Sequence, residues 1–172
     1  MDNYQQPNQQ QYQQPNQQQY QQPYQQPYQQ PYQQPGYAAP VMQLKTNRSL
    51  VKYILLSLIT FGIYGLVVMS SISSDINFIA GRYDGKKTMH FCLLAFVIAP
   101  LTFGIGTIVW YHKISERIGN ELRRRNINHA FDASTFWLWN VLGSLIIVGP
   151  FIYYHKFFTA MNYLSADYNA RG

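Results

Sequence analysis

Three long apolar runs, separated by short polar segments, occupy most of the chain after residue 44. They cover residues 50–69, 90–112 and 134–155, and the last two contain no Asp, Glu, Lys or Arg. A helix rises ~1.5 Å per residue, so about twenty residues cover the ~30 Å hydrocarbon core of a bilayer. Three such runs in succession exceed what buried helices of a soluble protein need. The pattern predicts an all-α, membrane-embedded domain.

The apolar runs also resemble one another in sequence, as copies of one unit do. A shift of 42 positions places Thr60-Phe61-Gly62-Ile63 on Thr102-Phe103-Gly104-Ile105, and a further 43 places Tyr111-His112-Lys113 on Tyr154-His155-Lys156. Repeats of this length set the architecture of a chain. We therefore expect a triplicated unit. Its copies cover about residues 48–80, 88–126 and 132–169, and its breaks lie at Thr60 and Gly62, Thr102 and Gly104, and Gly149 and Pro150.

The breaks are compatible with two arrangements. Beyond each break the apolar stretch holds only about seven or eight residues, a rise of ~12 Å, which is too short for a full return span. This favours three kinked transmembrane helices. The similar polar segments would then alternate between the two sides of the membrane, which is unusual for a repeat. The alternative is three re-entrant hairpins, closed at Gly62, Gly104 and Gly149, with every exit on the cytoplasmic side.

Each run continues into a polar helix with an apolar stripe at helical spacing. These amphipathic exits can pack together as a cap or lie among the lipid headgroups. In either case we expect a platform that presents Arg123, Arg124 and Arg125 to acidic lipid or to an acidic partner. The stripes are Ile72, Ile76 and Ile79; Ile114, Ile118 and Leu122; and Phe157, Met161 and Leu164.

Aromatic and basic residues at the ends of the runs are candidates for membrane-interface or partner-binding positions. Trp and Tyr concentrate at membrane interfaces, and Lys side chains extend to the headgroups. His112 and His155 occupy equivalent positions beside Lys, where interfacial anchoring is the favoured interpretation and a paired metal or proton site the alternative. The candidates are Trp110, Tyr111, His112, Lys113, Arg123, Arg124, Arg125, Tyr154, His155 and Lys156.

Residues 1–44 differ from the remaining membrane domain at 45–172. They consist largely of YQQP tetrads, with Asp2 as the single charge. Pro interrupts helices and strands, and Gln supplies no core, so we expect a disordered, low-complexity tail. It serves as a tether or as a series of Tyr contact points for a partner. The distribution of cations around the runs favours a cytoplasmic tail on a multi-pass protein of the cell membrane.

Motifs for catalysis are absent from the sequence. It contains no HExxH, phosphate-binding Gly-rich loop or GxSxG, and its single Cys92 excludes a disulfide. The apolar runs carry no carboxylate, which a proton relay normally needs. We therefore expect a non-enzymatic membrane accessory or scaffold protein without cofactor or metal. A small oligomeric channel or transporter is the alternative, and a membrane enzyme is third.

The net charge of +6 lies almost wholly in the membrane half of the chain. It is spread over flanks and loops, which indicates a lipid-facing role and not a nucleic-acid surface. The expected partners are the bilayer with its anionic lipid, a protein bound by the tail or the exits, and a second copy of the chain.

The segment LLSLITFGIYGLVVM with the following SSDIN, together with a second TFGI unit that ends in WYHK, resembles a known family. This is the bacterial membrane family named domain of unknown function 4234, and the resemblance covers about residues 45–169. It implies a small multi-span protein of the cell membrane. It implies no established activity and supplies no catalytic residue.

Overall fold

The computed structural model describes residues 39–172, and this part of the chain is all-helical without a strand. Residues 1–38, which hold most of the predicted tail, lie outside the described residues. The elements in chain order are α1 (Leu50–Ile59), α2 (Ile63–Asp84), α3 (Phe91–Leu93), the π-helix η1 (Leu94–Ile98), α4 (Ala99–Leu101), α5 (Ile105–Arg124), α6 (Ala133–Thr135), the π-helix η2 (Phe136–Val141), the 3-10 helix η3 (Leu142–Leu145) and α7 (Gly149–Arg171).

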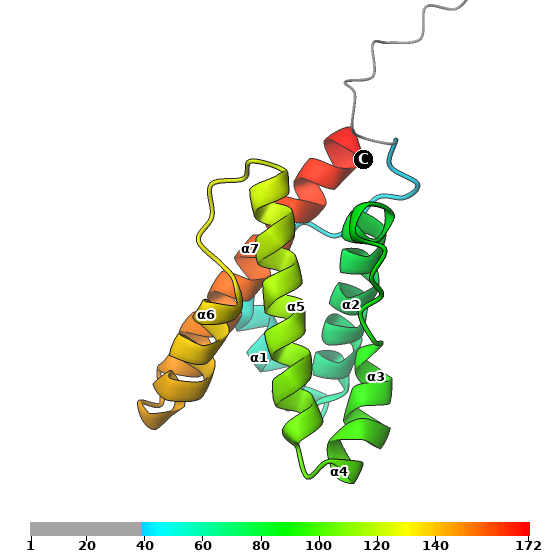
Figure 1. Ribbon diagram of the computed structural model, residues 1–172. Coiled ribbons are helices and arrows are strands. Elements are labelled where there is room, and N and C mark those ends of the chain that lie inside the picture. Colours follow the sequence, from blue (N-terminus) through cyan, green and yellow to red (C-terminus); the bar gives the residue numbers. More distant parts are fainter. Residues whose placement is uncertain (1–38) are drawn as a thin grey trace, which may run out of the picture. The chain divides into compact units, whose positions relative to one another are not determined.

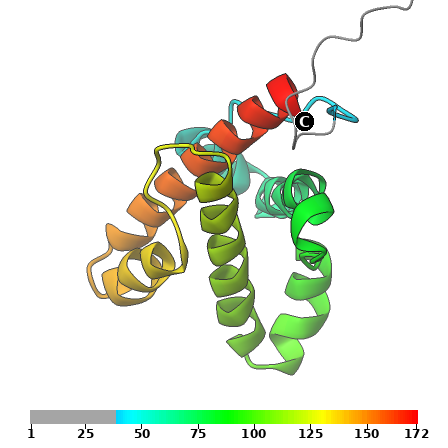
Figure 2. The same ribbon diagram turned by 45° about the horizontal axis from the view of Figure 1, so that its top comes forward.

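Each apolar run forms a helical hairpin instead of the single kinked helix that we favoured. The first hairpin pairs α1 with α2, the second pairs α3, η1 and α4 with α5, and the third pairs α6, η2 and η3 with α7. The three tips lie at one end of the bundle, at the bottom of Figure 1. The opposite end, called the polar end below, holds the loops 85–90 and 125–132 and the C-terminus (Figures 1 and 2).

Two of the hairpin tips reverse the chain with the same backbone geometry. Phe61 and Phe103 both have φ of 50°, and the glycines that follow, Gly62 and Gly104, have φ of 88° and 85°. Two successive residues in the left-handed region end one helix and redirect the chain into the next. A bulky residue rarely adopts a positive φ. The Thr-Phe-Gly sequence therefore encodes a reversal, which a kink-based interpretation misses.

The threonine at each of these tips joins the two helices that it separates. The Thr60 hydroxyl donates to the Leu56 carbonyl at 2.6 Å and accepts from the Tyr64 N–H at 2.9 Å. Thr102 makes the equivalent pair of hydrogen bonds, at 2.7 and 2.9 Å. Backbone groups that the reversal would leave without partners are thus satisfied locally.

The third tip lacks a left-handed residue and closes by contact between glycines. A Cβ atom on Gly149 would lie 2.2 Å from the Gly143 carbonyl oxygen, so only glycine permits this approach. Pro150 follows at the start of α7, where its missing N–H has no helical partner to lose. Pro100 lies within the first part of the second hairpin, in α4. The helix widens to a π turn before it and continues to Leu101.

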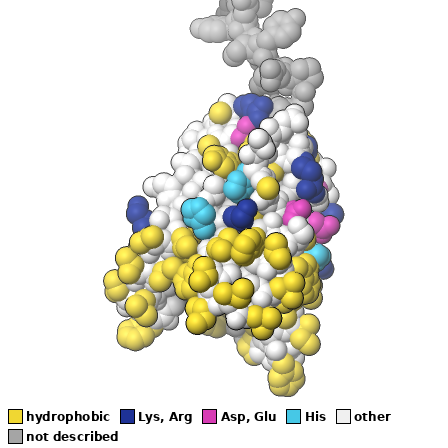
Figure 3. Space-filling view, turned by 90° about the vertical axis from the view of Figure 1, so that its left-hand side faces the viewer, with side chains coloured by type: hydrophobic (Ala, Val, Ile, Leu, Met, Phe, Trp, Pro, Cys, Tyr) yellow, Lys and Arg dark blue, Asp and Glu magenta, His cyan; other side chains and the backbone are white. Residues whose placement is uncertain are grey.

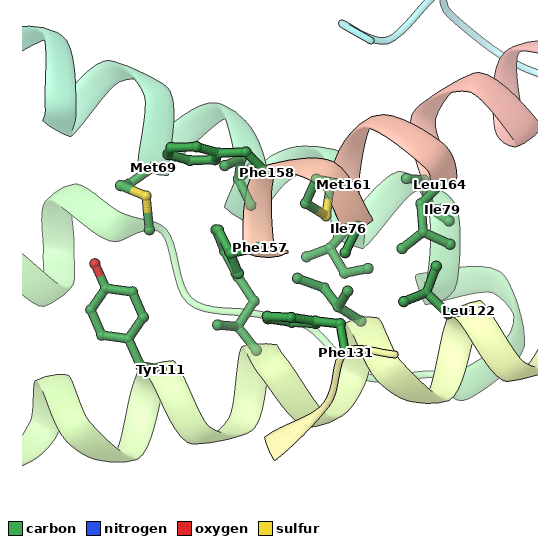
Figure 4. Packing of buried hydrophobic residues seen from close by; sticks show 14 of the residues in the cluster. Met69, Ile76, Ile79, Tyr111, Leu122, Phe131, Phe157, Phe158, Met161 and Leu164 are labelled. Atoms are coloured by element: carbon green, nitrogen blue, oxygen red, sulfur yellow. The ribbon is translucent and has the colours of Figure 1, made fainter. Parts of the chain in front are cut away.

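The apolar stripes of the exits pack against one another and form the core. All nine stripe residues are at most 1 % exposed, and Figure 4 shows Ile76, Phe157 and Met161 among the packed side chains. Burying a large apolar side chain contributes roughly 1.5–3 kcal/mol. Of the two placements that the sequence allowed for the exits, the structure has the packed one.

The hairpins close into a ring around this core. The first helix of each hairpin packs on its own second helix and on that of a neighbouring hairpin: α1 contacts α2 and α7, α3 and η1 contact α2 and α5, and α6 and η2 contact α5 and α7. The first hairpin thus rests on the last. Each hairpin therefore packs against both of its neighbours.

The described residues contain one helix that is long and apolar enough to cross a membrane, α2 with 22 residues. Half of its most apolar window is buried inside the protein. α1 and residues 91–101 are shorter apolar helices. α5 and α7 are long enough to span but not apolar enough, so the three predicted transmembrane helices are not confirmed.

Candidate functional site

The hairpin tips carry the most exposed large apolar side chains. Phe61 is 98 % exposed, Phe103 97 % and Leu145 86 %. Figure 3 shows the hydrophobic side chains gathered at the tip end, whereas charged side chains lie toward the polar end. A soluble monomer rarely exposes apolar surface of this kind without using it for binding. We call the following residues the tip surface: Phe61, Ile63, Leu101, Phe103, Ile105, Leu145, Ile146, Ile147 and Val148.

An aromatic layer lies inside the bundle between the tips and the polar end. Trp110 and Tyr111, which we expected in an interfacial belt, are both buried. The Trp110 indole N–H donates to the Met89 carbonyl at 2.9 Å, and the hydroxyls of Tyr111 and Tyr154 are hydrogen-bonded at 2.9 Å. The Trp110 ring packs on Phe91 of its own hairpin, and the Tyr111 ring packs on Phe136 and Tyr153 of the third hairpin, so both rings face the inside of the bundle.

The two equivalent histidines lie nearer the outside than the aromatic layer. His112 accepts a hydrogen bond from the Trp137 indole N–H at 3.1 Å through Nδ1, and His155 is exposed. Lys113 is exposed and Lys156 is half-buried. Histidine side chains lie along the border between apolar and charged surface in Figure 3. Within residues 39–172, no three His, Cys, Asp or Glu side chains come together as a metal site would require.

The three consecutive arginines have three different environments, and Arg125 does not face outward as we expected. Its side chain is 0 % exposed and donates to Glu121 Oε1 at 2.6 Å and to Asp167 Oδ2 at 2.7 Å. Arg124 also pairs with Glu121, and its guanidinium lies 3.6 Å from the centre of the Tyr83 ring. Arg123 is 64 % exposed. Arg125 is thus a buried link between α5 and α7.

Arg117 is a buried cation of α5. Its Nε donates to Asp84 Oδ2 at 2.7 Å, and its Nη1 donates to Asn77 Oδ1 at 2.5 Å and Thr88 Oγ1 at 2.7 Å. Nη2 donates to the Lys86 carbonyl at 2.6 Å. Arg117 therefore holds the loop between α2 and α3 in place. A shift of 42 positions aligns Arg117 with Asp75, which is also charged and buried. The repeat was thus the signal in the sequence that could have pointed to a charge with a structural role at this position.

Arg48 and Asp132 fix the starts of the first and third hairpins. Arg48 forms an ion pair with Asp75 of α2, and burial lowers the pKa of the Arg48 guanidinium while Asp75 opposes that shift. Asp132 accepts from the Ser134 hydroxyl at 2.6 Å and from the Thr135 N–H at 3.1 Å. The bond from Ser134 holds the pKa of Asp132 below its usual value, so an ionised cap begins α6.

The chain continues to contact α7 before the first hairpin begins. The Leu44 N–H donates to Asn169 Oδ1 at 2.7 Å, and the Asn169 amide returns a bond to the Leu44 carbonyl at 2.8 Å. The Val41 N–H donates to the Tyr168 hydroxyl at 3.1 Å. Residues 41–44, which the sequence analysis assigned to the tail, are therefore bound to the polar end.

The family model described as Domain of unknown function (DUF4234) matches residues 48–120. The matched segment includes both Thr-Phe-Gly tips and ends within α5. The resemblance seen in the sequence is confirmed over these residues. No curated protein and no solved structure matches the chain.

Proposed function

We propose that this chain, whose residues 48–120 match the DUF4234 family, is a non-enzymatic accessory or scaffold protein of a cell membrane. It inserts three hairpin tips into one leaflet from one side. The observation that carries the proposal is the tip surface, where Phe61 and Phe103 are almost fully exposed at the same end of the bundle. Hydrocarbon is the environment in which such tips cost least.

The length of the hairpins supports insertion to about half the bilayer. α1 has 10 residues, which is a rise of ~15 Å against a hydrocarbon core of ~30 Å. A chain that reverses in lipid must satisfy its backbone groups internally. The first turn does so through the Thr60 hydroxyl and through the Gly62 N–H, which donates to the Ser57 carbonyl at 2.7 Å.

The polar end supplies the surface that faces the headgroups and a partner. The exposed cations Lys52 and Lys113 lie beyond the apolar tips, where Lys side chains extend to anionic lipid. Residues 41–44 are bound at this end as well. In this proposal the Tyr- and Gln-rich segment is the tether or partner-binding part of the scaffold.

A channel or transporter is less well supported. Hairpins that return at mid-bilayer provide no continuous path across it, and the apolar runs contain no carboxylate. We therefore retain conduction only as an outcome that electrical recording of the reconstituted protein would detect.

Flotation of the purified chain with lipid vesicles tests insertion through the tips. Phe61→Asp with Phe103→Asp should move most of the protein out of the floating fraction, because two ionised groups would have to enter hydrocarbon. The matched control is Phe78→Asp with Tyr163→Asp, at exposed positions away from the tips, and it should float like the unmodified chain. Flotation that is unchanged by the tip pair would refute insertion through the tips.

A further inference from the structure

An open groove of about 940 Å³ runs along the outer side of the second hairpin. One wall is α5 from Ile105 to Arg124. The other is formed by the end of α2, the loop that follows it, Ile98 of η1 and Thr102. This volume lies within the range of ~300–1,000 Å³ that is usual for small-molecule sites. The groove is large enough for part of a lipid.

The chemistry of the groove changes along its length. Ile105, Val109 and Trp110 line it toward the tip, and the charged residues begin at Lys113, a rise of about 12 Å from Ile105 along α5. This change from apolar to charged lining runs in the same direction as the change from hydrocarbon to headgroups around the inserted hairpin. The apolar part of the groove lies at acyl-chain depth and its charged part at headgroup depth.

The charged part of the groove has an excess of cations. Arg117 is paired with Asp84, and Arg124 is paired with Glu121, which also binds Arg125, so each of these four lining charges has an ion-pair partner. The remaining lining charges are Lys86, Lys87 and Lys113 against Glu116. Within residues 39–172, no carboxylate lies at ion-pair distance from the Lys87 or Lys113 ammonium group. An anionic headgroup is the complement of this end.

A smaller hollow of about 420 Å³ occupies the corresponding place on the first hairpin. It is lined by Tyr64, Val67 and Val68, and a shift of 42 positions sets these residues on Gly106, Val109 and Trp110 of the larger groove. Gly106 contributes no side chain where Tyr64 contributes a ring. A Cβ atom at Gly106 would lie only 2.5 Å from Ile98 Cγ2, so the second hairpin is built without a side chain there. Gly106 thus allows α5 to approach Ile98 closely and places no ring in the larger groove.

We propose that this groove binds one anionic phospholipid. The headgroup phosphate lies between Lys87 and Lys113, and one acyl chain follows Val109 and Ile105 toward the tip. This inference rests on the proposed insertion of the tips, because that insertion sets the groove at the right depth. The bound lipid fastens the second hairpin to the leaflet with a specificity that the apolar tip surface lacks.

Native mass spectrometry of the purified chain measures the site directly. The protein is exposed to phosphatidylglycerol and phosphatidylcholine with the same acyl chains, and the lipids that it retains are counted. One phosphatidylglycerol should be retained in preference to phosphatidylcholine. Because a near-surface cation contributes roughly 1 kcal/mol toward anionic lipid, Lys87→Gln with Lys113→Gln should lower its retention about tenfold or more.

Two further variants separate the groove from general charge effects. Arg123→Gln with Lys156→Gln removes the same charge outside the groove and should leave retention within about twofold. Val109→Trp fills the apolar part without a change of charge and should lower retention of the lipid. Equal retention of both lipids, or equal loss in the Arg123 and Lys156 variant, would overturn the proposal.

Failure of lipid binding and failure of tip insertion give different results. A chain that floats with vesicles but shows no preference for phosphatidylglycerol has inserted tips and no anionic lipid site. A chain that does not float refutes tip insertion, whatever lipid it retains in detergent.

Discussion

The side chain of Asn162 holds the backbone of Arg48, although 114 positions separate them. The Arg48 N–H donates to Asn162 Oδ1 at 2.9 Å, and Asn162 Nδ2 donates to the Arg48 carbonyl at 2.8 Å. Asn77 of α2 holds Thr88, just before the second hairpin, with bonds of 2.7 and 2.9 Å. In each case an amide on a long helix fixes the segment that enters a neighbouring hairpin. The two bonds between Asn162 and Arg48 join the third hairpin to the start of the first and so close the ring of hairpins.

Asn162→Ala should loosen the first hairpin. It leaves two partly buried backbone groups of Arg48 without partners, which costs about 1–3 kcal/mol. Thermal unfolding of the purified protein in detergent measures the loss. Asn128→Ala, in the exposed loop between α5 and α6, is the control and should change stability by less than about 0.5 kcal/mol. Equal effects of the two variants would show that the closing bonds do not matter.

The side of the membrane reached by each loop distinguishes hairpins from single spans. In a Cys92→Ser background, Lys86→Cys and Asn128→Cys should both be protected from an impermeant thiol reagent added to intact cells, because both loops lie at the polar end. Cations favour the cytoplasmic side. Labelling of Lys86→Cys with protection of Asn128→Cys would instead support single spans. Labelling of both after the cells are opened is the control for reactivity.

Replacement of Arg125 should be far more damaging than replacement of Arg123. Arg125→Gln removes the buried cation that Glu121 and Asp167 share and leaves them only their more exposed partners Arg124 and Arg171. Breaking a buried pair costs about 3–5 kcal/mol. Arg123→Gln alters an exposed side chain and should cost less than about 0.5 kcal/mol. Unfolding in detergent compares the two. Comparable stability of both variants would contradict the role of Arg125 as an internal link.

Two truncations should separate the tail from the residues bound to α7. Deletion of residues 1–38 should leave the unfolding temperature and helical content unchanged, because every contact described above joins residues within 39–172. Deletion of residues 1–44 also removes Val41 and Leu44 from their partners Tyr168 and Asn169, and should lower the unfolding temperature measurably. Circular dichroism during heating measures both. Identical curves would show that residues 41–44 contribute nothing.

The sequence alone was sufficient for the elements that local pattern controls. The stripe at spacing three and four, as in Ile72, Ile76 and Ile79, predicted helices with a buried face, and those residues are in the core. The shift of 42 positions likewise identified Thr60-Gly62 and Thr102-Gly104 as equivalent breaks, which are the two tips of identical geometry. The apolar stripe and the Thr-Phe-Gly motif are both local patterns, and each is contained within a few turns of one segment.

Tertiary structure decided what those signals left open. A Thr-Phe-Gly break in the sequence is compatible with a kink and with a reversal. In the structure the chain reverses there, and α1 packs on α7 of the last hairpin. Arg123, Arg124 and Arg125 look alike in sequence, yet successive residues of a helix point about 100° apart. Contacts with α2 and α7 are what mark out Arg125 as the buried one. Arg117 and Asn162 act on backbone that is distant in sequence. Such roles arise only when the ring of hairpins is closed, because their partners come from different hairpins.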